Sequence, residues 1–138
     1  MTPRAAHRSD ARRVPGFALA AVFVMPVSGF ACETCIEDQI AATYDHAVVA
    51  KAEVSKQLIL YAAVRGKNAG TASSDAKVRR AIASVAGVDR SSIRVSAAPP
   101  AASFAWDAKR LRSGTVLRAI NSRLAGSGLA LVALQTFG

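Results

Sequence analysis

Apolar and polar residues along positions 58–138 follow the spacings of short strands and amphipathic helices. The run "LILYAAV" is continuously apolar, as in a buried strand, whereas Val78, Ile82 and Val85 recur at helical spacing. Later stretches return to alternation and then to a second helical stripe. The pattern predicts strand, helix, strand, strand, helix and strand, over Leu58–Val64, Ala76–Ala86, Ser92–Ala97, Ala102–Asp107, Ser113–Ala125 and Leu129–Phe137.

This order of elements predicts an α+β fold. Two right-handed βαβ crossovers joined by a hairpin form one four-stranded antiparallel sheet with both helices on one face. The expected architecture is therefore a ferredoxin-like βαββαβ sandwich. Ser74 or Asp75 is expected to cap its first helix, and Gly87 to end that helix in a left-handed conformation.

A further helix is predicted before the sandwich, over Ile36–Gln57, because this stretch has no Gly or Pro. Its apolar residues at four-residue intervals are Ile36, Ile40, Tyr44 and Val48. Alternation in the first strand turns Ile59 and Tyr61 away from the two sandwich helices. We expect the N-terminal helix to cover this open sheet face or the same face of a second copy.

The first 31 residues have the three-part pattern of a secretory signal peptide. Met1–Gly16 is polar and carries four arginines, Phe17–Ala31 is apolar and uncharged, and small residues stand at Gly29 and Ala31. The apolar run is shorter than the roughly 20 residues that span a bilayer. We predict cleavage near Ala31 and a periplasmic or secreted mature chain without a transmembrane segment. The alternative is a buried N-terminal helix. The chain then divides into a leader (1–31), a cysteine segment with an amphipathic helix (32–57) and the sandwich (58–138).

The charge of the chain is strongly positive, with a formal net charge of +9. Residues 32–138 keep 14 basic and 8 acidic side chains, which favours weak attraction to anionic surfaces. Export argues against a nucleic-acid partner. The open sheet face does too, because it carries Tyr61 but has Ala105 where an RNA-recognition module would stack a second base on an aromatic ring.

Three segments resemble the heavy-metal-associated domain of copper chaperones and metal-pumping ATPases: "VRRAIASVAGVDRSSIRV", "AASFAWDAKRL" and "VLRAINSRLAGSGLALV". In that family, a helix runs into Gly-Val, a later strand ends in an aromatic residue and Asp, and a second helix follows. This chain matches that order at Gly87-Val88, Trp106-Asp107 and Ile120–Gly126. The resemblance covers Leu58–Phe137 and implies the ferredoxin-like fold. Metal-binding members carry Cys-x-x-Cys on the first strand–helix loop, but here Arg65–Asp75 has no Cys, His or Met.

The two cysteines of the chain lie elsewhere, at Cys32 and Cys35, just before the predicted N-terminal helix. Thiolates at a helix start are stabilised by free N–H groups, and two of them suit Cu(I) or half of a tetrahedral Zn site. The alternatives are a thiol–disulfide redox pair, an inert short-loop disulfide and lipidation of Cys32.

Two neighbouring polar residues are assigned no role in a metal site. In one continuous helix, His46 would lie about 16 Å along the axis from Cys35, too far to share an ion, so we interpret it as a surface or packing residue. Asp45 is interpreted as a solvated charge.

These observations predict an exported, metal-binding or chaperone-like protein that holds a soft metal such as Cu(I), or Zn, through Cys32 and Cys35. The alternative is a metal-free ferredoxin-like module with a structural disulfide, which binds a partner protein or forms a homodimer through its open sheet face. No catalytic residues are predicted and no enzymatic activity is expected, because the sequence offers no Ser/His/Asp set and no paired carboxylates in a plausible pocket.

Overall fold

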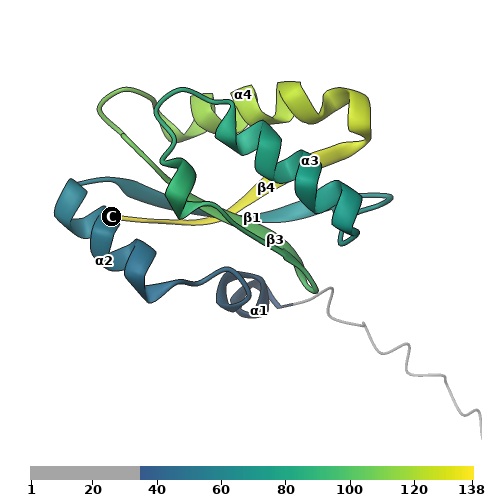
Figure 1. Ribbon diagram of the computed structural model, residues 1–138, viewed down its shortest axis with the longest axis horizontal. Coiled ribbons are helices and arrows are strands. Elements are labelled where there is room, and N and C mark those ends of the chain that lie inside the picture. The colour runs from purple at the N-terminus through teal and green to yellow at the C-terminus, as the bar shows by residue number, and fades with distance from the viewer. Residues whose placement is uncertain (1–34) are drawn as a thin grey trace, which may run out of the picture.

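One sheet with helices on both of its faces makes up residues 35–138, the part of the chain that the computed structural model describes (Figure 1). Two short 3₁₀ turns, at Arg90–Ser92 and Ala125–Ser127, join longer elements. The helices and strands are α1 (Ile36–Ala41), α2 (His46–Ser55), β1 (Leu58–Gly66), α3 (Ala72–Ala83), β2 (Arg94–Ala97), β3 (Pro100–Trp106), α4 (Ser113–Leu124) and β4 (Leu129–Phe137).

The four strands lie in the order β2-β3-β1-β4, and every neighbouring pair is antiparallel. Helices α3 and α4 cover one face of this sheet (Figure 1). The predicted order of six elements is confirmed, as is the α+β class with a four-stranded antiparallel sheet. The arrangement is compatible with a ferredoxin-like fold.

The main core lies between the sheet and helices α3 and α4. It gathers the residues that alternation and helical spacing had placed inward, such as Phe104 and Trp106 from β3 with Ile82 and Ile120 from the helices. The indole N–H of Trp106 donates to the carbonyl of Leu111 at 2.9 Å, so the largest buried ring keeps its one polar atom paired.

The opposite face of the sheet is covered by the chain's own N-terminal segment, as expected. Val48 and Ala52 of α2 pack on Ile59 and Tyr61 of β1 and on Ala105 of β3, which together form a second, smaller core. In Figure 1, α1 and α2 lie below the sheet, while α3 and α4 lie above it.

The prediction of one continuous helix over Ile36–Gln57 is wrong, because the chain breaks between α1 and α2. The Asp45 carboxylate accepts hydrogen bonds from the N–H groups of Ala47 and Val48, at 2.9 and 3.2 Å, and its backbone is extended. Asp45 thus starts a new helix as its N-cap. Tyr44 is 54% exposed and Ile36 is 55% exposed, so both lie off the buried stripe to which their spacing had assigned them.

The cap of α3 also differs from the expectation. Thr71 caps the helix, and its hydroxyl and that of Ser74 form a reciprocal capping box. The helix therefore starts at Ala72, and the loop before it is shorter than predicted. The prediction that Gly87 ends this helix is wrong, because α3 ends at Ala83 with Ser84 as its C-cap. Gly87 does have the expected left-handed conformation, with φ +94°, in the turn that follows. Within residues 35–138, no helix is long and apolar enough to cross a membrane.

Candidate binding site

The predicted metal ligands are only partly visible. Cys32 lies outside the described residues, as does the predicted leader, Met1–Ala31. Cys35 is exposed and stands immediately before α1, where its carbonyl accepts hydrogen bonds from the N–H groups of Asp38 and Gln39. The helix it precedes has six residues, so the long dipole expected behind the thiols is absent.

His46 is exposed at the first position of α2, which confirms that it is a surface residue. Because the helix breaks before it, the separation of about 16 Å from Cys35 expected for a straight helix no longer applies. Among residues 35–138, no three side chains of His, Cys, Asp or Glu are grouped so that they could hold a metal ion.

The interpretation of Asp45 as a solvated charge is wrong. Besides capping α2, its carboxylate accepts a hydrogen bond from Nε of Arg94 on β2 at 2.8 Å and forms an ion pair with Nη2 of the same guanidinium at 2.7 Å. This bond to Arg94 is the main reason that the pKa of Asp45 is lowered, followed by the capping bond from Val48. Asp45 therefore links the N-terminal segment to the edge of the sheet.

A second charged contact holds the middle of α2. The Lys51 ammonium donates to the Asp89 carboxylate at 2.7 Å and to the Ser91 hydroxyl at 2.8 Å. The hydrogen bond from Lys51 lowers the pKa of Asp89. Half of the Lys51 side chain is exposed, so this contact orients α2 more than it stabilises it.

A buried hydrogen bond holds the connection between α1 and α2. The Ser103 hydroxyl, from the centre of β3, donates to the Thr43 carbonyl at 2.8 Å. Both residues are buried, at 2% and 3% exposure. Water cannot replace this bond without entering the second core, so the N-terminal segment is an integral layer of the fold.

Between this layer and the sheet lies a pocket of about 570 Å³. Its walls are mainly apolar, with Ile40 on α1, Val49 and Ala52 on α2, Ile59 and Tyr61 on β1 and Phe137 at the end of β4. The rings of Tyr61 and Phe137 meet edge to face, with centroids 5.6 Å apart. Burial raises the pKa of Tyr61 above its ordinary value. Below, we call this space the apolar pocket.

One polar group stands out in the wall of the apolar pocket. The side-chain oxygen Oε1 of Gln57 is buried and has no hydrogen-bond partner within residues 35–138. Gln57 also borders a smaller hollow beside Asp107, so it lies between two cavities. A buried carbonyl oxygen without a donor is unfavourable, and a rotation of the Gln57 side chain toward the pocket would let an N–H or O–H group of a bound molecule satisfy it.

Sequence reasoning missed Phe137 as a residue of this face. Strict alternation from Leu129 and Leu131, which are buried under α4, would turn Phe137 toward the same helices. Instead, the β1–β4 register shifts between Tyr61 and Ala62, and one extra residue of β4 is accommodated there. This bulge pairs Phe137 with Ile59 and brings it onto the opposite face.

The signal for the α2 cap was present in the sequence. Asp45 precedes a helical run, as N-cap residues do, but the apolar spacing across it favoured one long helix. The bulge has no such signal, since neither Gly nor Pro marks the middle of β4.

Comparison of the chain with protein-family models, with curated proteins and with solved structures found no match. What the protein binds is therefore inferred from its own side chains.

Proposed function

We propose that this chain is a ferredoxin-like binding module that holds a small, mainly apolar molecule in the apolar pocket. The observation that carries the proposal is the pocket itself, about 570 Å³ between the N-terminal helices and the sheet. Sites for small molecules have volumes of about 300–1,000 Å³ and combine apolar walls with a few polar groups. Binding, and not catalysis, is the activity proposed.

The shape of the wall favours a flat or ring-containing ligand. The edge-to-face contact of Tyr61 and Phe137 presents aromatic surface beside the aliphatic side chains of Ile40 and Val49. Phe137 is 46% exposed, so part of its ring remains available to a ligand. A ligand that covered it would gain about 25 cal/mol for each Å² of apolar surface removed from water.

The polar groups of the pocket narrow the chemistry of the ligand. Gln57 offers a buried acceptor without a donor, and Glu53 adds a carboxylate to the lining. Both are acceptors, so the ligand that fits best carries an N–H or O–H donor on an apolar body. One hydrogen bond to Gln57 would contribute about 1 kcal/mol.

A homodimer through the open sheet face has less support. Ile59, Tyr61 and Ala105, which would form that interface, are already covered by Val48 and Ala52 of the same chain. The contacts of Asp45 and Ser103 hold this cover in place. A second copy would have to displace a layer that is part of the fold.

Fluorescence titration with 1-aminoanthracene, an apolar ring system with an N–H donor, tests the proposal. We expect saturable binding of one molecule per chain, which Val49→Trp abolishes by filling the apolar pocket. Val54→Trp is the matched control, because Val54 lies on the same helix but is 87% exposed and outside the pocket. Equal binding by both variants would place the probe elsewhere and refute the proposal.

The acceptor role of Gln57 has its own test. Anthracene lacks the donor, so wild-type protein should bind 1-aminoanthracene about fivefold more tightly than anthracene. Gln57→Leu should remove this preference while keeping affinity for anthracene. A preference that persists in the variant would show that another group receives the donor.

A soft-metal function through Cys32 and Cys35 is a second proposal, favoured by the exposed position of Cys35 just before α1. Two thiolates suit near-linear Cu(I). Replacing both cysteines with Ser should abolish Cu(I) uptake, measured by competition with a chromophoric Cu(I) chelator, and leave 1-aminoanthracene binding unchanged. Undiminished uptake would exclude these thiols as ligands.

Export is proposed together with this function. It rests on the pattern of Met1–Ala31, and intact-mass measurement of the protein recovered from the producing cells tests it. A mature chain that begins near Cys32 is expected. The same spectrum, recorded with and without reductant, reports a disulfide or a lipid on that residue.

A further inference from the structure

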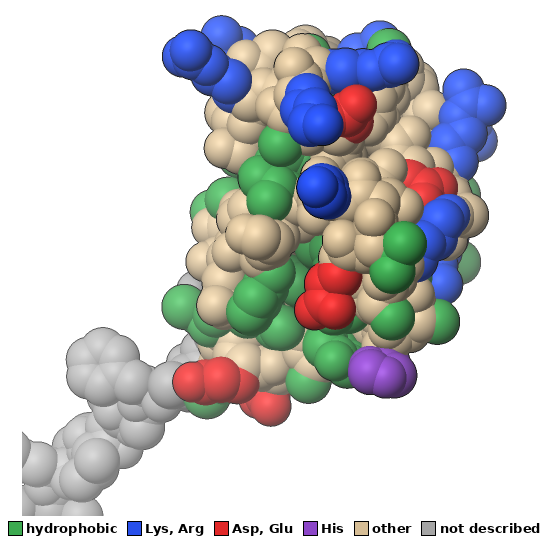
Figure 2. Space-filling model, turned by 90° about the vertical axis from the view of Figure 1, so that its left-hand side faces the viewer, with side chains coloured by type: hydrophobic (Ala, Val, Ile, Leu, Met, Phe, Trp, Pro, Cys, Tyr) green, Lys and Arg blue, Asp and Glu red, His purple; other side chains and the backbone are tan. Residues whose placement is uncertain are grey.

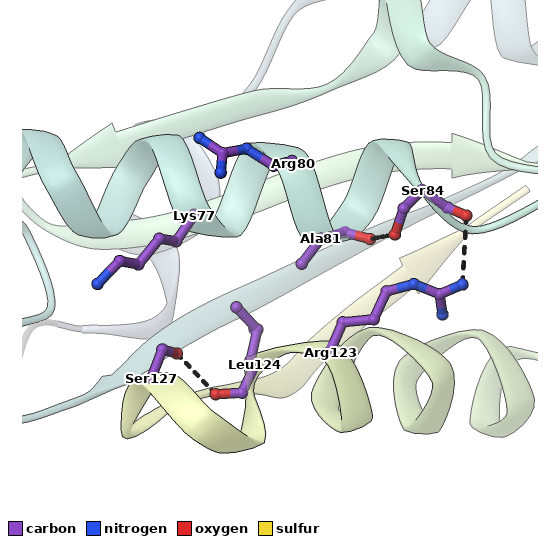
Figure 3. Close-up of a pocket in the computed structure, with 7 residues that line it drawn as sticks. All are labelled: Lys77, Arg80, Ala81, Ser84, Arg123, Leu124 and Ser127. Carbon is purple, nitrogen blue, oxygen red and sulfur yellow. Dashed lines mark hydrogen bonds between the residues drawn. The ribbon is translucent and has the colours of Figure 1, made fainter.

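A second hollow lies on the other side of the sheet, between α3 and α4, with a volume of about 330 Å³ (Figure 3). Lys77, Arg80 and Ser84 line it from the α3 side at intervals of three and four residues, which place them on one face of that chain segment. Arg123 and Leu124 line it from α4. We call this hollow the basic groove.

The three cations of the basic groove are exposed, and within residues 35–138 none of them forms an ion pair. Arg123 crosses from α4 toward α3, where it donates to the Ser84 carbonyl at 3.5 Å (Figure 3). Lys77 extends into the space between the helices, and Arg80 lies over α3. Their charges are therefore available to an external anion.

The neutral donors of the basic groove are already in use. The Ser84 hydroxyl donates to the Ala81 carbonyl at 2.7 Å, and the Ser127 hydroxyl donates to the Leu124 carbonyl at 2.6 Å. The floor between them consists of Ala81 and Leu124, which are apolar. A ligand thus meets cationic donors at the rim and an apolar floor, which suits an oxyanion attached to an apolar body.

Charge is distributed unevenly over the molecule. Helices α3 and α4 carry five basic residues and one acidic residue, Asp75, whereas residues 35–57 carry four acidic and two basic ones. In Figure 2, most Lys and Arg side chains accordingly lie in the upper part, toward α3 and α4. Such a distribution orients the molecule in the field of an anionic surface, with these two helices toward it.

A nucleic acid fits this face less well than a lipid. Single-stranded nucleic acids are bound by stacking bases on aromatic rings, and neither α3 nor α4 contains Phe, Tyr or Trp. An apolar floor beside the cations suits the glycerol and acyl parts of a phospholipid.

We propose that the α3–α4 face docks on membranes that contain anionic phospholipid, with Lys77, Arg80 and Arg123 facing separate lipid phosphates along the rim of the basic groove. This inference is independent of the apolar pocket, which lies on the other face of the sheet. Each cation near an anionic surface contributes about fivefold to the affinity.

Flotation of the full chain with vesicles tests the proposal, using phosphatidylcholine alone or mixed three to one with phosphatidylglycerol. We expect binding to the mixed vesicles that falls about 25-fold in the double variant Lys77→Gln/Arg80→Gln. The matched control is Lys109→Gln/Arg112→Gln, which removes the same charge from exposed positions. Arg112 precedes α4, about 16 Å along the helix from Arg123, and this control should lose less than about threefold.

Relaxation enhancement by a gadolinium lipid in bicelles of the same composition identifies the docked face. Amides of α3 and the C-terminal half of α4 should broaden first, and Arg123→Gln should weaken the effect even if the double variant unfolds. Equal losses in both double variants, or broadening centred on another face, would overturn the proposal. The proposal would also be overturned if the protein bound inorganic phosphate through these residues in the absence of vesicles, or if single-stranded DNA displaced it from the vesicles by binding the same residues.

Discussion

The hydrogen bond from Ser103 to the Thr43 carbonyl makes a sharp prediction, because it joins the N-terminal segment to the centre of the sheet. Ser103→Ala removes the donor and leaves the carbonyl of Thr43, a residue that is only 3% exposed, without a partner. Leaving such a group unsatisfied costs about 1–3 kcal/mol. The side chain itself shrinks by one oxygen, so lost packing adds little.

The expected result is a lower free energy of unfolding in urea, by about 1–3 kcal/mol. For a domain of this size, the melting temperature should fall by at least about 4 °C. Native-state hydrogen exchange should show where the structure is weakened: amides of α2 should exchange faster, while the exchange rates of amides in α3 and α4 should change little.

Ser96→Ala is the control for this prediction. Ser96 pairs with Ala101 in the sheet, lies on the same face as Arg94 and is half-buried, and within residues 35–138 its hydroxyl forms no hydrogen bond. It should change stability by less than about 0.5 kcal/mol. If Ser103→Ala were as stable as this control and α2 exchanged at its normal rate, the bond would not be holding the N-terminal layer.

Three further predictions concern the two charged contacts of α2, the close approach of β1 to the start of β4, and the apolar pocket. Because the pKa values of Asp45 and Asp89 are lowered in the folded chain, their stabilisation is present above the ordinary carboxyl pKa of about 3.9 and is lost as the pH falls through the lowered values. Thermal unfolding between pH 6 and 2 should show this loss, and a less steep loss in Asp45→Asn/Asp89→Asn. Gly66→Ala should lower the free energy of unfolding by at least about 2 kcal/mol, because φ is +138° and a Cβ there would collide with the carbonyl of Gly128. Gly126→Ala is the control and should be nearly neutral, because the space around Gly126 is open. Equal melting temperatures of the two variants would contradict this prediction. Ile40→Asp should weaken both urea stability and 1-aminoanthracene binding, because this half-buried side chain packs on the second core and lines the apolar pocket.

Most of the six sandwich elements could be predicted because their signals are local. For example, the apolar residues Val116, Ile120 and Leu124 recur at helical spacing, and all three are buried on one side of α4. The last strand was predicted with the bounds it has, Leu129–Phe137, because glycines precede a continuous run of β-forming residues.

The N-terminal layer was predicted only in part. That it covers Ile59 and Tyr61 followed from apolar residues without another partner. Its break at Asp45 did not follow, because the apolar spacing continues across the break and competes with the capping signal. Arg94, 49 residues away, favours the cap by pairing with the same carboxylate, and no local pattern contains that contact.

The sequence pointed to the two cysteines as the candidate site, whereas the structure points to the apolar pocket, for a related reason. A Cys-x-x-Cys pattern can be recognised in any sequence, so it drew attention to Cys32 and Cys35. The apolar pocket has no motif, since its residues come from α1, α2, β1 and the end of β4. Only a fold that brings these segments together reveals it.

The sequence by itself determined which segments become strands and helices, and which side of each is apolar, because periodicity and capping act within a few residues. The tertiary structure decided where the N-terminal helix breaks, which face Phe137 joins and which cations of α3 and α4 line the same hollow. Each of these depends on contacts between residues far apart in the chain, and the energy of such contacts exists only once the layers have packed.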